Sequence, residues 1–221
     1  FATSNGNIRR NKLTDFHNIN ANGKIAMKLN ESDKLVNVLT CTQDSNIFLS
    51  TKLGKCIRFS CKDLRIFSGR SSVGVRGIKL ASGDSVISLA ILNGIDFDVN
   101  ERDEYLRVSA LVRRNEKVQN NILDDKKFSD LNSNEEFILS VTDKGFGKRS
   151  SAFEYRKTKR GGLGIANMQL SVRNGSQVIA SFPINQNDQL VLVTDKGKLI
   201  RCPVNDVRIG GRQTQGVTLF N

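Results

Sequence analysis

Two stretches, Thr142-Asp143-Lys144-Gly145 and Thr194-Asp195-Lys196-Gly197, share the chemistry of a tight hairpin turn. In each, an acidic residue precedes a glycine that can adopt a positive φ, which is typical of a type I turn with a glycine bulge. Each turn ends one hydrophobic run and opens another. Both glycines belong to a set of four that anchors equivalent repeats, at Gly6, Gly54, Gly145 and Gly197.

The repeats agree at several positions after the anchor glycine. An arginine stands four residues later, an acid nine residues later and a basic or imidazole side chain eleven residues later. A second glycine follows the anchor by 17 to 20 residues and opens another apolar run. Agreement at so many offsets predicts an array of similar supersecondary units. In order, these residues are Arg10, Arg58, Arg149 and Arg201; Asp15, Asp63, Glu154 and Asp206; His17, Arg65, Arg156 and Arg208; and Gly23, Gly74, Gly164 and Gly216.

The repeat length distinguishes between kinds of array. Successive anchors are 48, 91 and 52 residues apart, and the middle spacing falls to 47 once the 44 residues 93–136 are treated as an insertion. Units of about 50 residues suit the blades of a propeller-like fold, whereas a helical solenoid would need long apolar stripes at 3.6-residue spacing. We expect one all-β domain over residues 1–221, with blades at about residues 1–46, 47–92, 137–185 and 186–221.

Each unit is expected to supply about four strands, which make one blade. One strand enters the anchor turn and a second leaves it. The third begins at the second glycine, over residues 24–29, 75–80, 165–170 and 217–220, and the last closes the unit, over residues 35–41, 85–92 and 177–182. The insertion predicts a polar surface helix over residues 101–120 and a solvated linker over 121–136, with no part in the core.

Charge separates the repeats from the insertion. Residues 93–136 hold 11 acids and 7 bases, net −4, whereas the other 177 residues hold 27 bases against 11 acids, net +16. A body of that charge has a polyanion as its expected partner, and nucleic acid is favoured over a membrane surface. No run of about 18 apolar residues is present, so no membrane span is expected.

The repeated spacing of charges suggests two kinds of role for the basic residues. The arginine at offset four is expected to pair with the acid at offset nine inside each blade, a structural couple. The offset-eleven arginines follow an apolar residue that should be buried, so they should point outward; phosphate contact and ordinary solvated charge are equally compatible with that. Glycine-rich loops with Lys or Arg precede the second glycines, where the backbone can approach a phosphate, although plain connectors remain an alternative.

Catalysis is not expected in this chain. The single histidine, His17, occupies a repeat position that elsewhere holds arginine, so no Ser-His-Asp set can be assembled. The glycines Gly69 and Gly74 have Walker-type spacing, but Val75 stands where the lysine is required. The four cysteines lie at irregular spacings without a C-x-x-C pair, which favours reduced thiols over a zinc site or a disulfide framework.

Three segments resemble a known family. They are 74–80, 145–149 and 211–217, reading GVRGIKL, GFGKR and GRQTQGV, and they are similar to the C-terminal, DNA-wrapping domain of bacterial DNA gyrase A, in the type IIA topoisomerase family. The resemblance covers nearly all of the chain outside the insertion. The hallmark box of that family, Gln-Arg-Arg-Gly-Gly-Lys-Gly, has its nearest counterpart at residues 158–164, TKRGGLG, which loses the Gln and the Lys.

The resemblance implies a β-pinwheel, a propeller-like array in which strands are exchanged between blades and DNA bends around a basic rim. It implies duplex DNA as partner, with the rest of gyrase A and with gyrase B in an A2B2 assembly that uses ATP and Mg²⁺ to introduce negative supercoils. The chain itself is expected to hold no cofactor, metal or catalytic residue and to work in the bacterial cytoplasm, at the nucleoid. The topoisomerase IV counterpart and, less favoured, a protein-interaction propeller are the alternatives.

The candidate DNA-binding residues come from the offset-eleven positions and the loops around the second glycines. They are Arg65, Arg70, Arg76, Lys148, Arg156, Lys157, Lys159, Arg160, Gly161, Gly162, Arg208 and Arg212.

Overall fold

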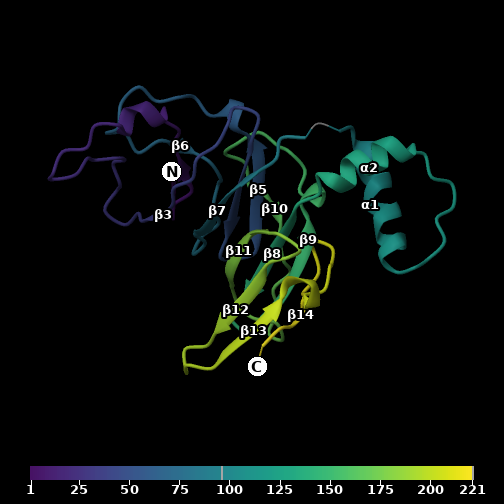
Figure 1. The fold of residues 1–221 in the computed structure, drawn as a ribbon. Helices are drawn as coiled ribbons and strands as arrows, with labels where there is room; N and C mark the ends of the chain where they lie inside the picture. Colours follow the sequence, from purple (N-terminus) through teal and green to yellow (C-terminus); the bar gives the residue numbers. More distant parts are fainter. Residues whose placement is uncertain (96, 221) are drawn as a thin grey trace.

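The computed structural model describes residues 1–95 and 97–220, and it is a row of small antiparallel sheets with two helices at one side (Figure 1). The first sheet has the order β3-β1-β2-β6, the second β10-β5-β4-β7 and the third β11-β8-β9-β14; β12 and β13 form a hairpin. The strands are β1 (Ala2–Thr3), β2 (Asn7–Ile8), β3 (Leu35–Asn37), β4 (Asn46–Thr51), β5 (Lys55–Ser60), β6 (Val75–Arg76), β7 (Val86–Leu92), β8 (Phe137–Thr142), β9 (Phe146–Ser151), β10 (Ile165–Ala166), β11 (Val178–Ile184), β12 (Gln189–Val193), β13 (Leu199–Pro203) and β14 (Val217–Thr218).

Every four-stranded sheet takes its last strand from the following unit. The strand that begins at the second glycine crosses back, so that β6 pairs with β2, β10 with β5 and β14 with β9. The strand exchange implied by the family resemblance is therefore confirmed. The exchanged strands are only two residues long, shorter than the runs of four to six residues expected from the sequence.

Two other expectations about strands are wrong. Residues 24–29 form no strand, and residues 38–41 do not continue β3. The fourth unit contributes the two-stranded hairpin β12–β13, and its third strand, β14, completes the third sheet in the way that β6 and β10 complete the first and second.

The central strands of the second and third sheets are buried on both faces, because each of these two sheets is packed between two neighbours. In β4, Ile47 and Leu49 pack with the first blade, whereas Phe48 faces the third blade. In β8, Ile138 faces the second blade and Leu139 the fourth unit. Alternate side chains of a strand point to opposite faces, so a continuous hydrophobic run here fills two separate cores.

The paired glycines explain how the exchanged strand can dock. Gly54 (φ +78°) and Gly164 (φ +70°) lie at the two ends of the β5–β10 contact. A Cβ at Gly54 would lie 2.5 Å from Met168 O, and one at Gly164 would lie 2.3 Å from Cys56 O. Only a residue without a side chain allows this approach of two backbones. The same arrangement recurs at Gly6 with Gly74 and at Gly145 with Gly216.

We predict that Gly164→Ala destabilises the chain. The left-handed backbone alone costs about 1–2 kcal/mol for a side-chain-bearing residue, and the contact with Cys56 O adds to it. Gly162→Ala is the matched control, because its Cβ would have only Lys159 O within reach, at 4.0 Å. Thermal unfolding of both variants checks this, and an equal loss in the two would contradict the docking role of Gly164.

The insertion folds as a helical hairpin with a core of its own, which corrects two expectations. Its helices are α1 (Val99–Arg113) and α2 (Asp125–Ser133), so residues 121–136 are not a linker. Asp98 caps α1 in a capping box with Glu101, and Asp124 caps α2. Tyr105, Leu123 and Leu131 are buried together with Phe153, a residue of the third repeat. Neither helix is long and apolar enough to cross a membrane, and no other helix among the described residues is.

Phe153 is the point where the insertion attaches to the array. It lies in the short 3-10 turn η3 (Ala152–Glu154), and the rings of Phe97 and Tyr105 meet it edge-on at centroid distances of 4.9 and 5.5 Å. The same position of the other three units holds Thr14, Lys62 and Asn205, all exposed; the last two lie in the turns η2 (Cys61–Asp63) and η4 (Val204–Asp206). The third unit therefore has a hydrophobic residue there because the insertion covers it.

We predict that deletion of residues 95–135 with a short linker gives a chain that self-associates, because Phe153 becomes exposed. Adding Phe153→Lys, the residue type at the equivalent position of the second unit, should restore a monomer that unfolds cooperatively. Asn93 and Glu136 are kept, since Asn93 N–H donates to the Glu136 carboxylate (2.8 Å). Light scattering and thermal unfolding distinguish the two variants. Loss of cooperative unfolding in the deletion that carries Phe153→Lys would show that the insertion is needed by the array.

Candidate nucleic-acid interface

Arginines at offset eleven occupy equivalent exposed positions in three consecutive units. Each follows a buried apolar side chain at the end of a 3-10 turn, as the sequence predicts, so the turn itself directs the arginine outward. Because the units stack on one another, equivalent positions fall on the same edge of the array. These exposed residues are Arg65, Arg156 and Arg208, which follow the buried Leu64, Tyr155 and Val207. The guanidinium of Arg65 also lies 4.4 Å from the ring centre of Phe67.

The loops that follow these arginines are joined to the preceding units by hydrogen bonds along the same edge. In each, an arginine donates to the carbonyl two residues after the second glycine of the preceding unit. The three bonds run from Arg70 to Ile25 O (2.7 Å), from Arg160 to Arg76 O (3.0 Å) and from Arg212 to Ala166 O (2.9 Å). The sequence predicts a role in DNA binding alone for these side chains; the structure gives each a second task in joining blades. A guanidinium has five N–H donors, so donors remain for a phosphate.

Two of the candidate residues are not placed for phosphate contact. Lys148 is buried, and its Nζ donates to Gly211 O (2.7 Å) and Arg212 O (2.5 Å), inside the fourth unit's loop. Burial lowers the pKa of the Lys148 amine to about 7, and a neutral amine still has donors for both carbonyls. Gly161 N–H is used in a hydrogen bond to Gly77 O (2.6 Å). Sequence spacing could not reveal either contact, since both depend on how neighbouring loops stack.

In the first unit, Arg9 takes the place that Lys148 has in the third. The sequence did not single out Arg9 as a buried donor. Its side chain is buried and donates to Ser72 O (2.8 Å) and to the carbonyls of Gly69 and Arg70. Arg9 and Lys148 stand three residues after their anchor glycines, where the second unit has Ile57. A basic residue three positions after the anchor glycine therefore indicates a buried cation, over which the glycine-rich loop of the next unit closes.

The remaining candidates lie at the surface of this edge. Arg76, Lys157, Lys159 and Gly162 are in or beside the loops and reach solvent. With the offset-eleven arginines and the loop arginines, the basic residues among them form what we call the basic rim: Arg65, Arg70, Arg76, Arg156, Lys157, Lys159, Arg160, Arg208 and Arg212.

Two of the offset-four arginines, Arg58 and Arg149, join blades and do not pair with the offset-nine acids, contrary to expectation. Arg58 is buried and donates to Ala152 O (2.8 Å) in the next unit and to Asn93 O (3.0 Å). Arg149 donates in the same way to Val207 O (2.8 Å) and to Asn205. The offset-nine Glu154 instead accepts from Arg212 N–H (2.7 Å) at the loop of the following unit. Spacing within one repeat suggests a partner in the same repeat, but the neighbouring unit is closer.

We predict that Arg58→Ala lowers the free energy of unfolding by roughly 1.5–3 kcal/mol, because the hydrogen bonds from its buried, charged guanidinium to Ala152 O and Asn93 O are lost. Arg201→Ala, at the same offset of the last unit, should cost less than about 0.5 kcal/mol, since Arg201 is exposed. Denaturant unfolding of the two variants measures both values. Equal losses would favour the pairing with the repeat's own acid that the sequence suggested.

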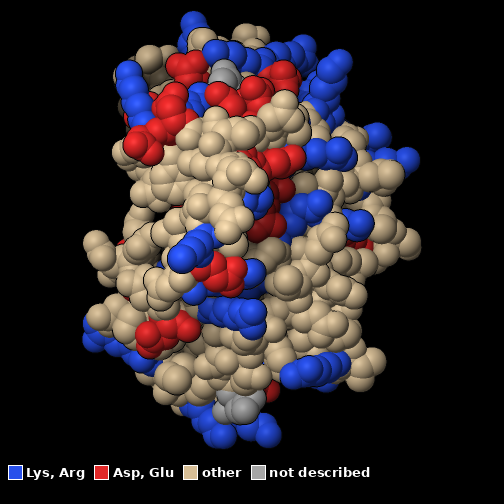
Figure 2. Space-filling model, turned by 90° about the vertical axis from the view of Figure 1, so that its right-hand side faces the viewer, with Lys and Arg blue, Asp and Glu red and all other residues tan. Residues whose placement is uncertain are grey.

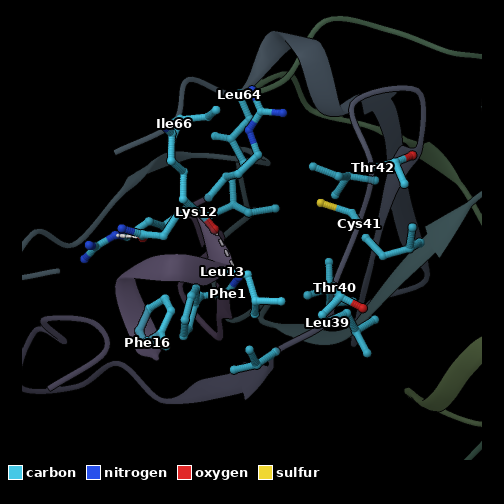
Figure 3. A pocket seen from close by; sticks show the side chains of 18 of the residues that line it. Phe1, Lys12, Leu13, Phe16, Leu39, Thr40, Cys41, Thr42, Leu64 and Ile66 are labelled. Carbon is cyan, nitrogen blue, oxygen red and sulfur yellow. Dashed lines mark hydrogen bonds between the residues drawn. The ribbon is translucent and has the colours of Figure 1, made fainter. Parts of the chain in front are cut away.

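A large, mainly apolar hollow belongs to the first blade (Figure 3). Its volume is about 670 Å³, and its walls come from the 3-10 turn η1 (Leu13–Phe16), from residues 38–43 and from Leu64 and Ile66. Burial raises the pKa of the Cys41 thiol in its wall to about 11, which keeps the sulfur protonated and a weak nucleophile. Among residues 1–95 and 97–220, no three His, Cys, Asp or Glu side chains gather as a metal site.

Comparison with known proteins gives the family. The model of the DNA gyrase C-terminal domain, described as a beta-propeller, matches residues 1–42, 45–93, 136–185 and 188–221 and leaves out most of the insertion. The chain belongs to this family. It is 48% identical to the DNA gyrase A protein of Granulibacter bethesdensis over 241 residues and 49% identical to that of Rickettsia prowazekii over 229 residues. All of this chain is covered, but it spans only about a quarter of each relative (26% and 25%).

Solved structures show the same fold. The C-terminal domain of DNA topoisomerase IV superposes with a TM-score of 0.76 at 19% identity, covering all of this chain and 56% of that one. The DNA gyrase A C-terminal domain superposes with a TM-score of 0.70 at 22% identity, covering all of this chain and 60% of that one. The gyrase family is thus assigned by the sequence relatives, and the protein-interaction propeller is not favoured.

Proposed function

We propose that this chain binds duplex DNA along the basic rim and bends it. The observation that carries this is the placement of Arg65, Arg156 and Arg208, exposed at one equivalent position of three stacked units. A charge of net +16 outside the insertion supplies the long-range attraction. The DNA-binding role of the gyrase A C-terminal domain supports the proposal through family membership.

The rim suits the backbone of DNA and not its bases. Short loops with arginines and lysines reach phosphates, whereas reading a sequence in the major groove takes an inserted helix or ribbon. Bending a site of 20–30 base pairs costs on the order of 1–6 kcal/mol, so several phosphate contacts on one side must offset it. A row of cations repeated from blade to blade provides such contacts.

Within a whole protein, the chain serves as the C-terminal, DNA-bending part of gyrase A. It acts with the rest of gyrase A and with gyrase B, in an A2B2 assembly of the bacterial cytoplasm that introduces negative supercoils. ATP and Mg²⁺ are then bound outside this chain, whose sequence has no Walker-type loop and whose role is not catalytic. The relatives named as gyrase A proteins favour this assembly over topoisomerase IV.

We predict that the full chain binds non-specific duplex DNA with a log–log salt slope that steepens by about 0.9 for each phosphate contacted. The triple variant Arg65→Gln, Arg156→Gln and Arg208→Gln should flatten that slope by roughly 2–3, with little change in thermal unfolding. A fluorescence titration at several salt concentrations measures the slope, and faster cyclisation of a short linear duplex with bound chain reports the bend.

The matched control removes the same charge from the insertion, with Arg114→Gln, Lys117→Gln and Lys126→Gln, all exposed. Equal slopes for the two triple variants would mean that net charge, and not the basic rim, binds DNA. A parent slope near zero would reject the proposal.

A further inference from the structure

The insertion and the basic rim enclose a groove lined by cations from both. Two adjoining hollows of about 430 and 420 Å³ share Arg102, from the first turn of α1, and Arg156, from the rim. Arg212 lines the first hollow and Lys157 the second. An acidic insertion thus turns a basic residue toward the rim.

The acids of this groove already have partners within the protein. Glu154 accepts from Arg212 N–H (2.7 Å), and Asp98 accepts from Glu101 N–H (2.8 Å) as the cap of α1. Asp103 accepts from Nε (2.8 Å) and Nη2 (2.6 Å) of Arg102. The side chain of Asp103 is 60% exposed, so this neighbouring pair is weak and is screened by water.

The arginines, in contrast, have donors to spare. Arg156 makes no side-chain hydrogen bond to another described residue, and Arg212 uses one guanidinium nitrogen on Ala166 O. Arg102 can exchange its exposed carboxylate partner for a phosphate, whose oxygens accept the same paired N–H donors. Donors from three arginines of the described chain therefore line one groove and remain open to an anion.

The first turn of α1 is held in place, so Arg102 is offered from a fixed position. The capping box of Asp98 and Glu101 closes the turn on one side. The contacts of Phe97 and Tyr105 with Phe153 dock it on the third unit, and α1 also touches η3. The space-filling view from the side of the helices shows acids and bases interleaved on this face, with the acids gathered chiefly in its upper part (Figure 2).

We propose that the insertion is part of the DNA interface, with Arg102 completing a phosphate-binding groove that it shares with Arg156 and Arg212. The ligand is a backbone phosphate of duplex DNA that follows the basic rim. This rests on the proposed function and adds to it that the insertion extends the rim beyond the repeats. The insertion's net charge of −4 then masks a local site of opposite sign.

The test is the salt dependence of duplex binding by the full chain carrying Arg102→Gln. Loss of one phosphate contact should flatten the log–log slope by about 1. Arg114→Gln is the matched control, because it removes the same charge from an exposed site at the other end of α1 and should leave the slope nearly unchanged. Arg102→Lys should recover part of the slope, and Arg102→Gln combined with Arg156→Gln should lose less than the sum of the single changes, since both would hold one phosphate.

A second variant keeps the test decisive if Arg102→Gln perturbs the helix, as thermal unfolding would show. Asp103→Asn releases the guanidinium of Arg102 and should tighten DNA binding with a steeper slope; unchanged binding would overturn the proposal. Equal slopes for Arg102→Gln and Arg114→Gln, in chains that unfold like the parent, would also overturn it. If the parent chain does not bind DNA, the proposed function itself fails. If the parent binds DNA and Arg102→Gln leaves the slope unchanged, only the role of the insertion fails.

Discussion

The array depends on the approach of two backbones at the exchanged strand. Ile165 and Ala166 pair with Cys56 and Lys55, and the glycines at the ends of this contact leave no room for a side chain. Without the exchange, β5 would be an open edge and each blade would be a three-stranded sheet. The glycines therefore recur in the sequence because a contact between units requires them, and not only because each unit contains a tight turn.

Buried basic side chains also join neighbouring units, through hydrogen bonds to backbone carbonyls. Arg58 and Arg149 reach carbonyls in the turn of the next unit, and Lys148 reaches those in its loop. The loop arginines repeat the pattern at the surface, where Arg160 and Arg212 bond to the preceding exchanged strand. Fold and interface thus draw on the same residue types, which is why charge alone does not reveal the role of a given arginine.

The sequence predicts the fold class, the repeat and the outward arginines, because glycine spacing and hydrophobic runs are properties of one unit. It fails where partners come from another unit. Spacing pairs Arg58 with Asp63, although the neighbouring unit's Ala152 O is the true acceptor, and it places Lys148 at the surface, although a loop of the fourth unit closes over it. The core of the insertion escapes prediction for a similar reason: the available signal was Phe153, the one hydrophobic residue at its offset in the four repeats of the sequence.

Strand exchange also has a consequence for synthesis on the ribosome. No blade can complete its sheet until the following unit has emerged, because its last strand lies there. The first blade joins Ile8 to Val75, but the second joins Cys56 to Ile165, with the whole insertion between them. At roughly 5–20 residues per second, those intervening residues take on the order of 5–20 s to appear, during which the edge of β5 stays open. The helical hairpin, whose own core is mostly local, can fold within that interval and shorten the effective tether that brings β10 back.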